Sequence, residues 1–122
     1  MWDASLPALG HVLMAGLPQP DLDALLAQAP FPRYTPYTLT TREELSAAVR
    51  TAHSQGWALA SEQIELGVCG FAVPVPDEHG RVTAALTVSV NLARHTEEEI
   101  IERFLESLQE IARQLQAACT TS

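Results

Sequence analysis

The chain has 122 residues, 47% of them hydrophobic and 18% charged, which is the composition of one globular domain rather than of a disordered segment. Seven arginines and no lysine stand against fifteen acidic residues, so the net charge is −8. Affinity for nucleic acid depends on clustered cations that neutralise phosphates, and these arginines are scattered singly. Direct DNA binding by this chain is therefore not expected.

The rest of the composition excludes several other classes of protein. The two cysteines, Cys69 and Cys119, show no CxxC spacing and no paired histidines, so neither zinc nor a disulfide framework is expected. No apolar run has membrane-spanning length, and the first residues lack the basic and apolar segments of a secretory signal. We expect a cytoplasmic protein with no cofactor and no contact with a membrane.

Three helices are predicted in the first half of the chain. The first runs from about Pro7 to Gly16, with Ser5 or a neighbour as its cap. The second covers about residues 21–28, and three prolines then impose an extended crossing over residues 30–36. In the third, Thr40 or Thr41 followed by Glu44 is typical of a capping box, and the helix ends at Gly56.

The second half predicts strands and a closing helix. A short strand is expected at residues 57–60, and two longer ones at 69–76 and 81–91, joined by a turn in which Gly80 supplies a positive φ. A helix then runs from Glu97 to about Ala118. Its expected apolar stripe consists of Ile100, Ile101, Phe104, Leu105, Leu108, Ile111, Ala112 and Leu115. This order predicts an α+β fold with an antiparallel sheet.

The two long strands each carry one bulky face and one face of small residues. In the last strand the expected bulky face is Val82, Ala84, Leu86, Val88 and Val90. The expected small face is Thr83, Ala85, Thr87, Ser89 and Asn91. Two interpretations are open: a solvated sheet face, which is the commoner case, or a concavity in which hydroxyl groups bind a polar ligand.

Other residues offer little chemistry. The four histidines are isolated singletons, Glu62 and Glu65 have no nucleophile beside them, and Cys69 is expected to be a buried, small apolar side chain. No phosphate-binding loop, nucleophile elbow or metalloprotease motif is present. We therefore expect no enzymatic activity.

Almost the whole chain, taken in order, resembles the C-terminal effector-binding domain of IclR-type bacterial transcription regulators. The segments that carry the resemblance are Leu9–Ala15 (LGHVLMA), Tyr34–Thr38 (YTPYT), Gln55–Ala58 (QGWA), Glu62 with Gly67, Gly70–Val75 (GFAVPV) and Gly80–Ser89 (GRVTAALTVS). The resemblance implies a GAF-like antiparallel sheet flanked by helices. It also implies that residues 1–122 form a single, partial effector-binding domain, without the family's winged helix-turn-helix.

The resemblance further implies a ligand and a site. The expected effector is a small organic acid, and the "TP" and "GWA" features are typical of regulators of aromatic-acid breakdown. Its carboxylate is expected at the start of the first helix, where helix N–H groups lack internal partners. The implied site residues are Ala8, Leu9, Ala60, Val68, Gly70, Thr87 and Ser89. At Ala60 some relatives have an acidic side chain, so the effector here is expected to differ.

The resemblance also implies partners. The chain is expected to form a homo-oligomer, either a dimer or a tetramer, and to reach DNA only through a winged-helix domain that it does not itself contain. With the resemblance in view, the concavity is favoured over the solvated face. An alternative is a ligand-free oligomerisation module, in which strand edges that the family's first strands would cover seek partners.

Overall fold

A computed structural model of the chain describes residues 6–120 and contains four helices and three strands in that range. The helices are α1 (Leu6–Ala15), α2 (Gln19–Leu26), α3 (Arg42–Gln55) and α4 (Glu97–Thr120). The strands are β1 (Ala58–Ser61), β2 (Val68–Pro76) and β3 (Val82–Asn91). They form one antiparallel sheet in the order β1-β2-β3. The predicted α+β class with an antiparallel sheet is confirmed.

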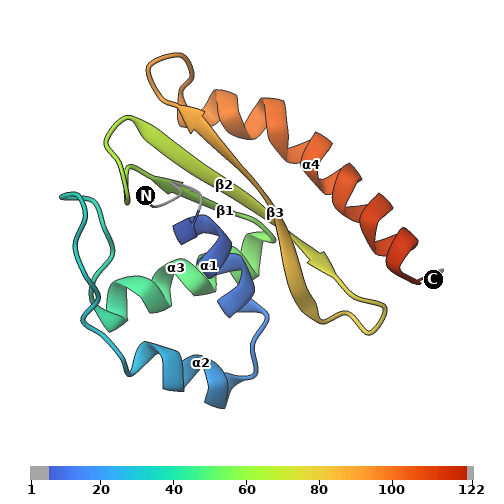
Figure 1. The fold of residues 1–122 in the computed structure, drawn as a ribbon, viewed down its shortest axis with the longest axis horizontal. Helices are drawn as coiled ribbons and strands as arrows, with labels where there is room; N and C mark the ends of the chain where they lie inside the picture. Colours follow the sequence, from blue (N-terminus) through green and yellow to red (C-terminus); the bar gives the residue numbers. More distant parts are fainter. Residues whose placement is uncertain (1–5, 121–122) are drawn as a thin grey trace.

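The sheet separates two groups of helices (Figure 1). The helix α4 packs along β2 and β3, and α1 packs across all three strands with α3 beside it. Under α4 lies a core of large side chains from the sheet and the helix, with Phe71, Val73 and Ile100 fully buried. Under α1 lies a second core made largely of alanines. The bulky and small faces predicted from the sequence therefore meet different helices.

Helix boundaries follow local chemistry. Thr41 is the N-cap of α3: its hydroxyl accepts from the Glu44 N–H while the Glu44 carboxylate accepts from the Thr41 N–H, which is the predicted capping box. Gly56 ends α3 at φ 83°. In α4 the Thr96 hydroxyl accepts from the Glu99 N–H. The helix α2 begins two residues earlier than predicted, at Gln19, because a proline is tolerated in the first helical turn.

Three details of the sequence interpretation are wrong. Val82 lies on the α1 side of the sheet, because a bulge at Thr83 breaks the alternation between Val82 and Ala84. Ile111 and Leu115 are 44% and 41% exposed, so the apolar stripe of α4 is not buried over its whole length. The short strand is Ala58–Ser61 rather than 57–60. The predicted cap Ser5 lies outside the described residues.

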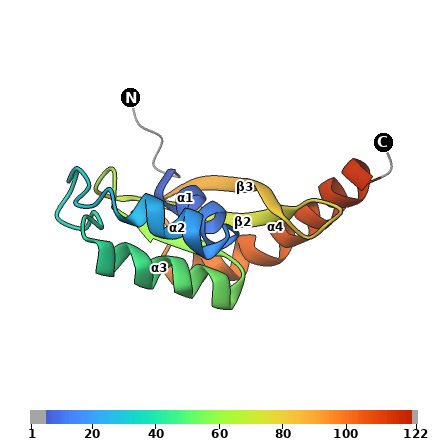
Figure 2. The same ribbon diagram turned by 90° about the horizontal axis from the view of Figure 1, so that it is seen from below.

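The segment between α2 and α3 folds back onto the connection between β1 and β2 (Figures 1 and 2). The hydroxyl of Thr35 donates to the carbonyl of Glu62, and that of Thr38 donates to the carbonyl of Gln63. The Arg33 guanidinium donates to the Pro36 carbonyl at 3.0 Å and so closes the segment on itself. These contacts place residues 31–40 along the outer side of α1.

Candidate functional site

Three of the site residues predicted from the sequence form one row across the sheet. Ala60 on β1 is opposite Gly70 on β2, and Gly70 is opposite Ser89 on β3. Opposed residues in an antiparallel pair point to the same face, so all three belong to the face that α1 covers. The row consists of a methyl group, a hydrogen atom and a hydroxymethyl group, which leaves very little side-chain volume above the strands.

Two further predicted residues flank this row on the same face. Thr87 is opposite Ala72, and Val68 is opposite Asn91. Ala60 and Ala72 are buried, Thr87 and Val68 are half-buried, and Ser89 is exposed. The small face therefore changes from a covered centre under α1 to an open margin along β3. The interpretation of the whole face as solvated is wrong, because α1 covers its centre.

The remaining two predicted residues, Ala8 and Leu9, lie in the first turn of α1. The C-terminal end of this helix lies against β3 near the hairpin, since a Cβ added at Gly16 would stand 2.9 Å from the Val82 Cβ. Ala8 packs with Ala60 in the core of alanines, so the N-terminal end of α1 lies near the row at Ala60 and Gly70. Figure 1 shows this direction of the helix across the strands.

The helix start gives Ala8 and Leu9 different properties. With Leu6 as first helical residue, Ala8 is the third, and its N–H belongs to the set that an α-helix leaves without an internal acceptor. Leu9 is the fourth, and its N–H is the first that the helix uses internally. Pro7 has no N–H to offer. The positive end of the helix dipole and the Ala8 N–H together favour an anion at this position.

The site has hydrogen-bonding groups but no side-chain charge. Its side chains are the hydroxyl groups of Thr87 and Ser89, with methyl or hydrogen elsewhere in the row. None of the seven residues lines a hollow of about 380 Å³ near Val82, or two smaller ones beside His11. The described residues thus give the site uncharged side chains, a buried centre at Ala60 and Gly70, and an exposed margin at Ser89.

Other residues that the sequence brought forward have structural roles. Cys69 is fully buried under α4, and burial raises the pKa of its thiol, which confirms the expected apolar role. Glu62 has a positive φ of 58°, and its carboxylate accepts from the Gly67 N–H at 2.9 Å, so it shapes a turn. Trp57 stacks on Phe71 with ring centroids 5.5 Å apart, which is a packing role. Trp2 lies outside the described residues.

The described range, residues 6–120, has neither a metal-binding cluster nor a membrane-spanning helix. No three His, Cys, Asp or Glu side chains of these residues are grouped to hold a metal ion. No helix in the same range is long and apolar enough to cross a membrane.

Two features of the structure were not assigned roles from the sequence. The paired hydroxyls of Thr35 and Thr38 clasp two segments far apart in the chain, and the signal for this was the YTPYT segment itself. His11 is the other: only 5% exposed, it occupies a core-facing position of α1 beside Ala8 and Val12. A histidine within the apolar spacing of a helix was the available signal.

Comparison with known proteins identifies the family. The family model for the C-terminal domain of bacterial IclR transcriptional regulators matches residues 4–117. The HTH-type transcriptional regulator XynR of Escherichia coli (strain K12) is 40% identical over 111 residues, which cover 91% of this chain and 44% of that protein. The chain belongs to the IclR family and corresponds to its C-terminal domain. It spans less than half the length of XynR.

Solved structures agree with this assignment. The crystal structure of a transcriptional regulator from Rhodococcus sp. RHA1 matches with a TM-score of 0.89 and 32% identity, over 93% of this chain and 46% of that one. A double mutant of the PobR inducer-binding domain from Acinetobacter, in complex with 3-hydroxybenzoic acid, matches with a TM-score of 0.84 and 27% identity. That match covers 94% of this chain and 66% of the PobR domain.

Proposed function

We propose that this chain senses a small organic acid, with an aromatic acid as the first candidate. The observation that carries the proposal is the row Ala60–Gly70–Ser89, which lies at the N-terminal end of α1 on a domain similar to one that holds 3-hydroxybenzoic acid. Small side chains leave room for a ring, hydroxyl groups orient it, and a helix N-terminus favours its carboxylate.

The seven predicted residues divide into roles within this proposal. The Ala8 N–H, in the same first turn of α1 as Leu9, donates a hydrogen bond to the carboxylate. Thr87 and Ser89 form hydrogen bonds with polar substituents of the acid. Ala60 and Gly70 provide the floor, with Val68 at its margin. Because Ala60 contributes a methyl group, the acid has no carboxylate partner at that end and needs no cationic or amine group there.

The wider activity follows from membership of a family of transcription regulators. An acid that binds one arrangement of an oligomer more tightly than another shifts the balance between them, and so changes the affinity for an operator. In this proposal residues 1–122 are a single, partial sensing domain of a cytoplasmic regulator that acts as a dimer or tetramer. DNA contact belongs to a winged-helix domain outside this sequence, and the chain catalyses no reaction.

The test is calorimetric titration of the chain with 3-hydroxybenzoic acid, benzoate and a series of short-chain acids. Replacing Thr87→Val together with Ser89→Ala removes both hydroxyl groups. The affinity for the acid that binds best is expected to fall about tenfold or more, because the two hydroxyl groups each contribute a hydrogen bond of about 1 kcal/mol. Thr83→Val is the matched control, because Thr83 lies on the same strand at the bulge and is exposed. Unchanged affinity in the double variant would show that the assigned site is wrong.

A ligand-free oligomerisation module is the second candidate. It is favoured by β3, a ten-residue strand that pairs only with β2 among the described residues, and unpaired edges attract other strands. Light scattering after size exclusion separates the two functions. The module is favoured by a stable oligomer that binds none of the acids in the series and whose mass none of them changes.

A further inference from the structure

A buried histidine of α1, on the side of the helix near residues 31–40 and α3, lies at the junction of two hollows. His11 is 5% exposed, and its side chain lines both hollows. Burial lowers the pKa of the imidazole to about 4, so the ring is neutral at pH 7. A neutral imidazole carries one N–H donor and one nitrogen acceptor, so His11 can form a hydrogen bond with a molecule in either hollow.

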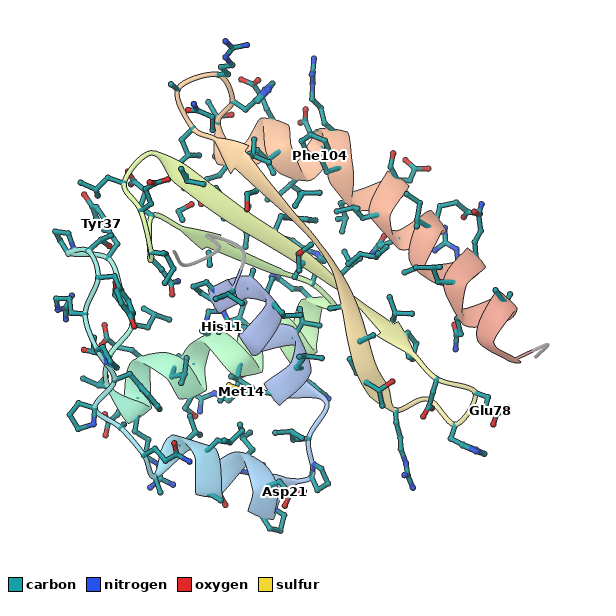
Figure 3. All side chains as sticks on the ribbon, in the orientation of Figure 1. His11, Met14, Asp21, Tyr37, Glu78 and Phe104 are labelled. Atoms are coloured by element: carbon teal, nitrogen blue, oxygen red, sulfur yellow. The ribbon has the colours of Figure 1, made fainter. Side chains whose placement is uncertain are left out.

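One hollow beside His11 is apolar. It has a volume of about 190 Å³ and lies between α1, the segment 31–40, α3 and the β1–β2 connection. Its wall includes the large side chains of Met14, Phe31, Tyr34, Leu45 and Ile64. Figure 3 labels His11 and Met14 on α1. An apolar cavity of about 150 Å³ is enough to hold benzene, so this hollow has room for a single substituted ring.

The other hollow is more polar. It has a volume of about 250 Å³ and lies between α1, α3 and β1, where Thr51 and Gln55 contribute polar side chains. His11, Leu39 and Gln63 line both hollows, so the imidazole lies where the apolar space meets the polar one. A ligand that fits both must have an apolar ring and a polar group close to it.

The charge of the lining residues determines which polar group a ligand can place beside His11. Among the described residues, no aspartate, glutamate, arginine or lysine lines either hollow, and the histidine is neutral. A carboxylate would lose its hydration there without gaining a cation, whereas a hydroxyl group needs only one acceptor. The unprotonated nitrogen of a neutral imidazole is such an acceptor.

We propose that this double hollow is a second ligand site, separate from the small face of the sheet, and that it binds an uncharged monocyclic aromatic molecule with one hydroxyl group. The ring lies between Met14 and the aromatic side chains of Phe31 and Tyr34, which are favourable contacts for an aromatic ring. The hydroxyl group donates a hydrogen bond to His11. Both sites border α1, the small face at its N-terminal end and this one on the side near residues 31–40 and α3.

Phenol is the probe, with toluene as the matched molecule that lacks the hydroxyl group. Binding to the chain is followed by the ring ¹⁵N signals of His11 and by calorimetry. Phenol is expected to shift these signals. In His11→Leu its affinity is expected to fall roughly fivefold to tenfold, the value of one hydrogen bond, while toluene affinity stays the same. An equal loss for both molecules would point to a general packing defect and would overturn the assigned role of His11.

A second variant tests the hollow itself. A Cβ built on Gly10 meets no atom within 4 Å, and Gly10 lines the apolar hollow, so Gly10→Leu is expected to place its side chain in that hollow. Phenol and toluene should then both lose binding. Ala24→Leu, on the exposed side of α2, is the control. The proposal is wrong if phenol binds Gly10→Leu as it binds the native chain, or if light scattering shows that Gly10→Leu only changes the oligomeric mass.

Discussion

Gly70 on β2 lies directly opposite Ser89 on β3, so no Cβ stands beside the serine on that side of its strand. The serine hydroxymethyl group is therefore the only side chain that this opposed pair places on the small face. A methyl group added at Gly70 would stand beside Ser89 on this face, within the proposed acid site.

Gly70→Ala is therefore expected to lower the affinity for the organic acid. It is expected to leave the fold intact, since alanine is favoured over glycine within a strand. Titration with the best acid and thermal unfolding measure the two effects. Phenol binding at His11 provides the internal control, because that site does not include Gly70. If acid affinity stays the same while phenol affinity falls, the two sites have been assigned the wrong way round.

Thr38 joins two distant segments, and its removal should loosen both. Its hydroxyl donates to the Gln63 carbonyl and accepts from the Thr35 N–H at 2.9 Å. In Thr38→Val these groups are left without their partner in a buried position, which is expected to cost about 1–3 kcal/mol of the free energy of unfolding. Urea denaturation measures this, and hydrogen exchange should accelerate over residues 31–40.

The control for that variant is Thr51→Val. Thr51 is exposed, and its hydroxyl donates to the carbonyl of Ala47 in its own helix. Its replacement is expected to change the free energy of unfolding by less than about 0.5 kcal/mol. Equal effects in the two variants would contradict the role of Thr38 in joining residues 31–40 to the β1–β2 connection.

The two glycines of the α1 region should respond to alanine in opposite directions. At Gly10 the new methyl group meets nothing within 4 Å, and the helix gains about 0.5–1 kcal/mol from the better helix former. At Gly16 it would stand 2.9 Å from the Val82 Cβ, so α1 or β3 must shift. In thermal unfolding, Gly10→Ala should have a higher melting temperature than the native chain, and Gly16→Ala a lower one. A stabilised Gly16→Ala would mean that α1 does not pack against β3 as described.

His11 makes the stability of the chain depend on pH. Its pKa is about 4 in the folded state because burial disfavours the charged ring, and 6.5 is the ordinary value. Below pH 6.5 the unfolded chain binds a proton that the folded chain does not, so the free energy of unfolding falls as the pH falls. From pH 7 to pH 5 the loss from this group is about 2 kcal/mol.

Comparing the native chain with His11→Gln isolates this effect, since glutamine does not titrate. The carboxyl pKa values of Glu44, Asp77 and Glu110 are lowered by hydrogen bonds from Thr41, Arg81 and Arg113 respectively, so these groups titrate below this window. Denaturant titrations at pH 7, 6 and 5 give the free energy of unfolding at each pH. This free energy should change less with pH in His11→Gln than in the native chain. An equal pH dependence in the two chains would mean that folding does not lower the pKa of His11.

Local chemistry alone determined most of the elements of this fold. The Thr41–Glu44 capping box and the left-handed Gly56 set the ends of α3, and the alternation along 82–91 indicated a strand with two different faces. These signals depend on neighbours within about four residues, so the sequence carries them directly. The IclR resemblance likewise depended on ordered segments, and the family assignment confirms it.

Tertiary structure decided what covers each face and which distant residues meet. The row Ala60–Gly70–Ser89 depends on the register of three strands, and the side on which Val82 lies depends on a bulge that no alternation rule predicts. The exposure of Ile111 and Leu115 depends on how far the sheet extends beneath α4. The hollows at His11 exist because Thr35 and Thr38 bring residues 31–40 onto the β1–β2 connection. Such contacts join residues about 25 positions apart, and their geometry is set by packing rather than by local propensity.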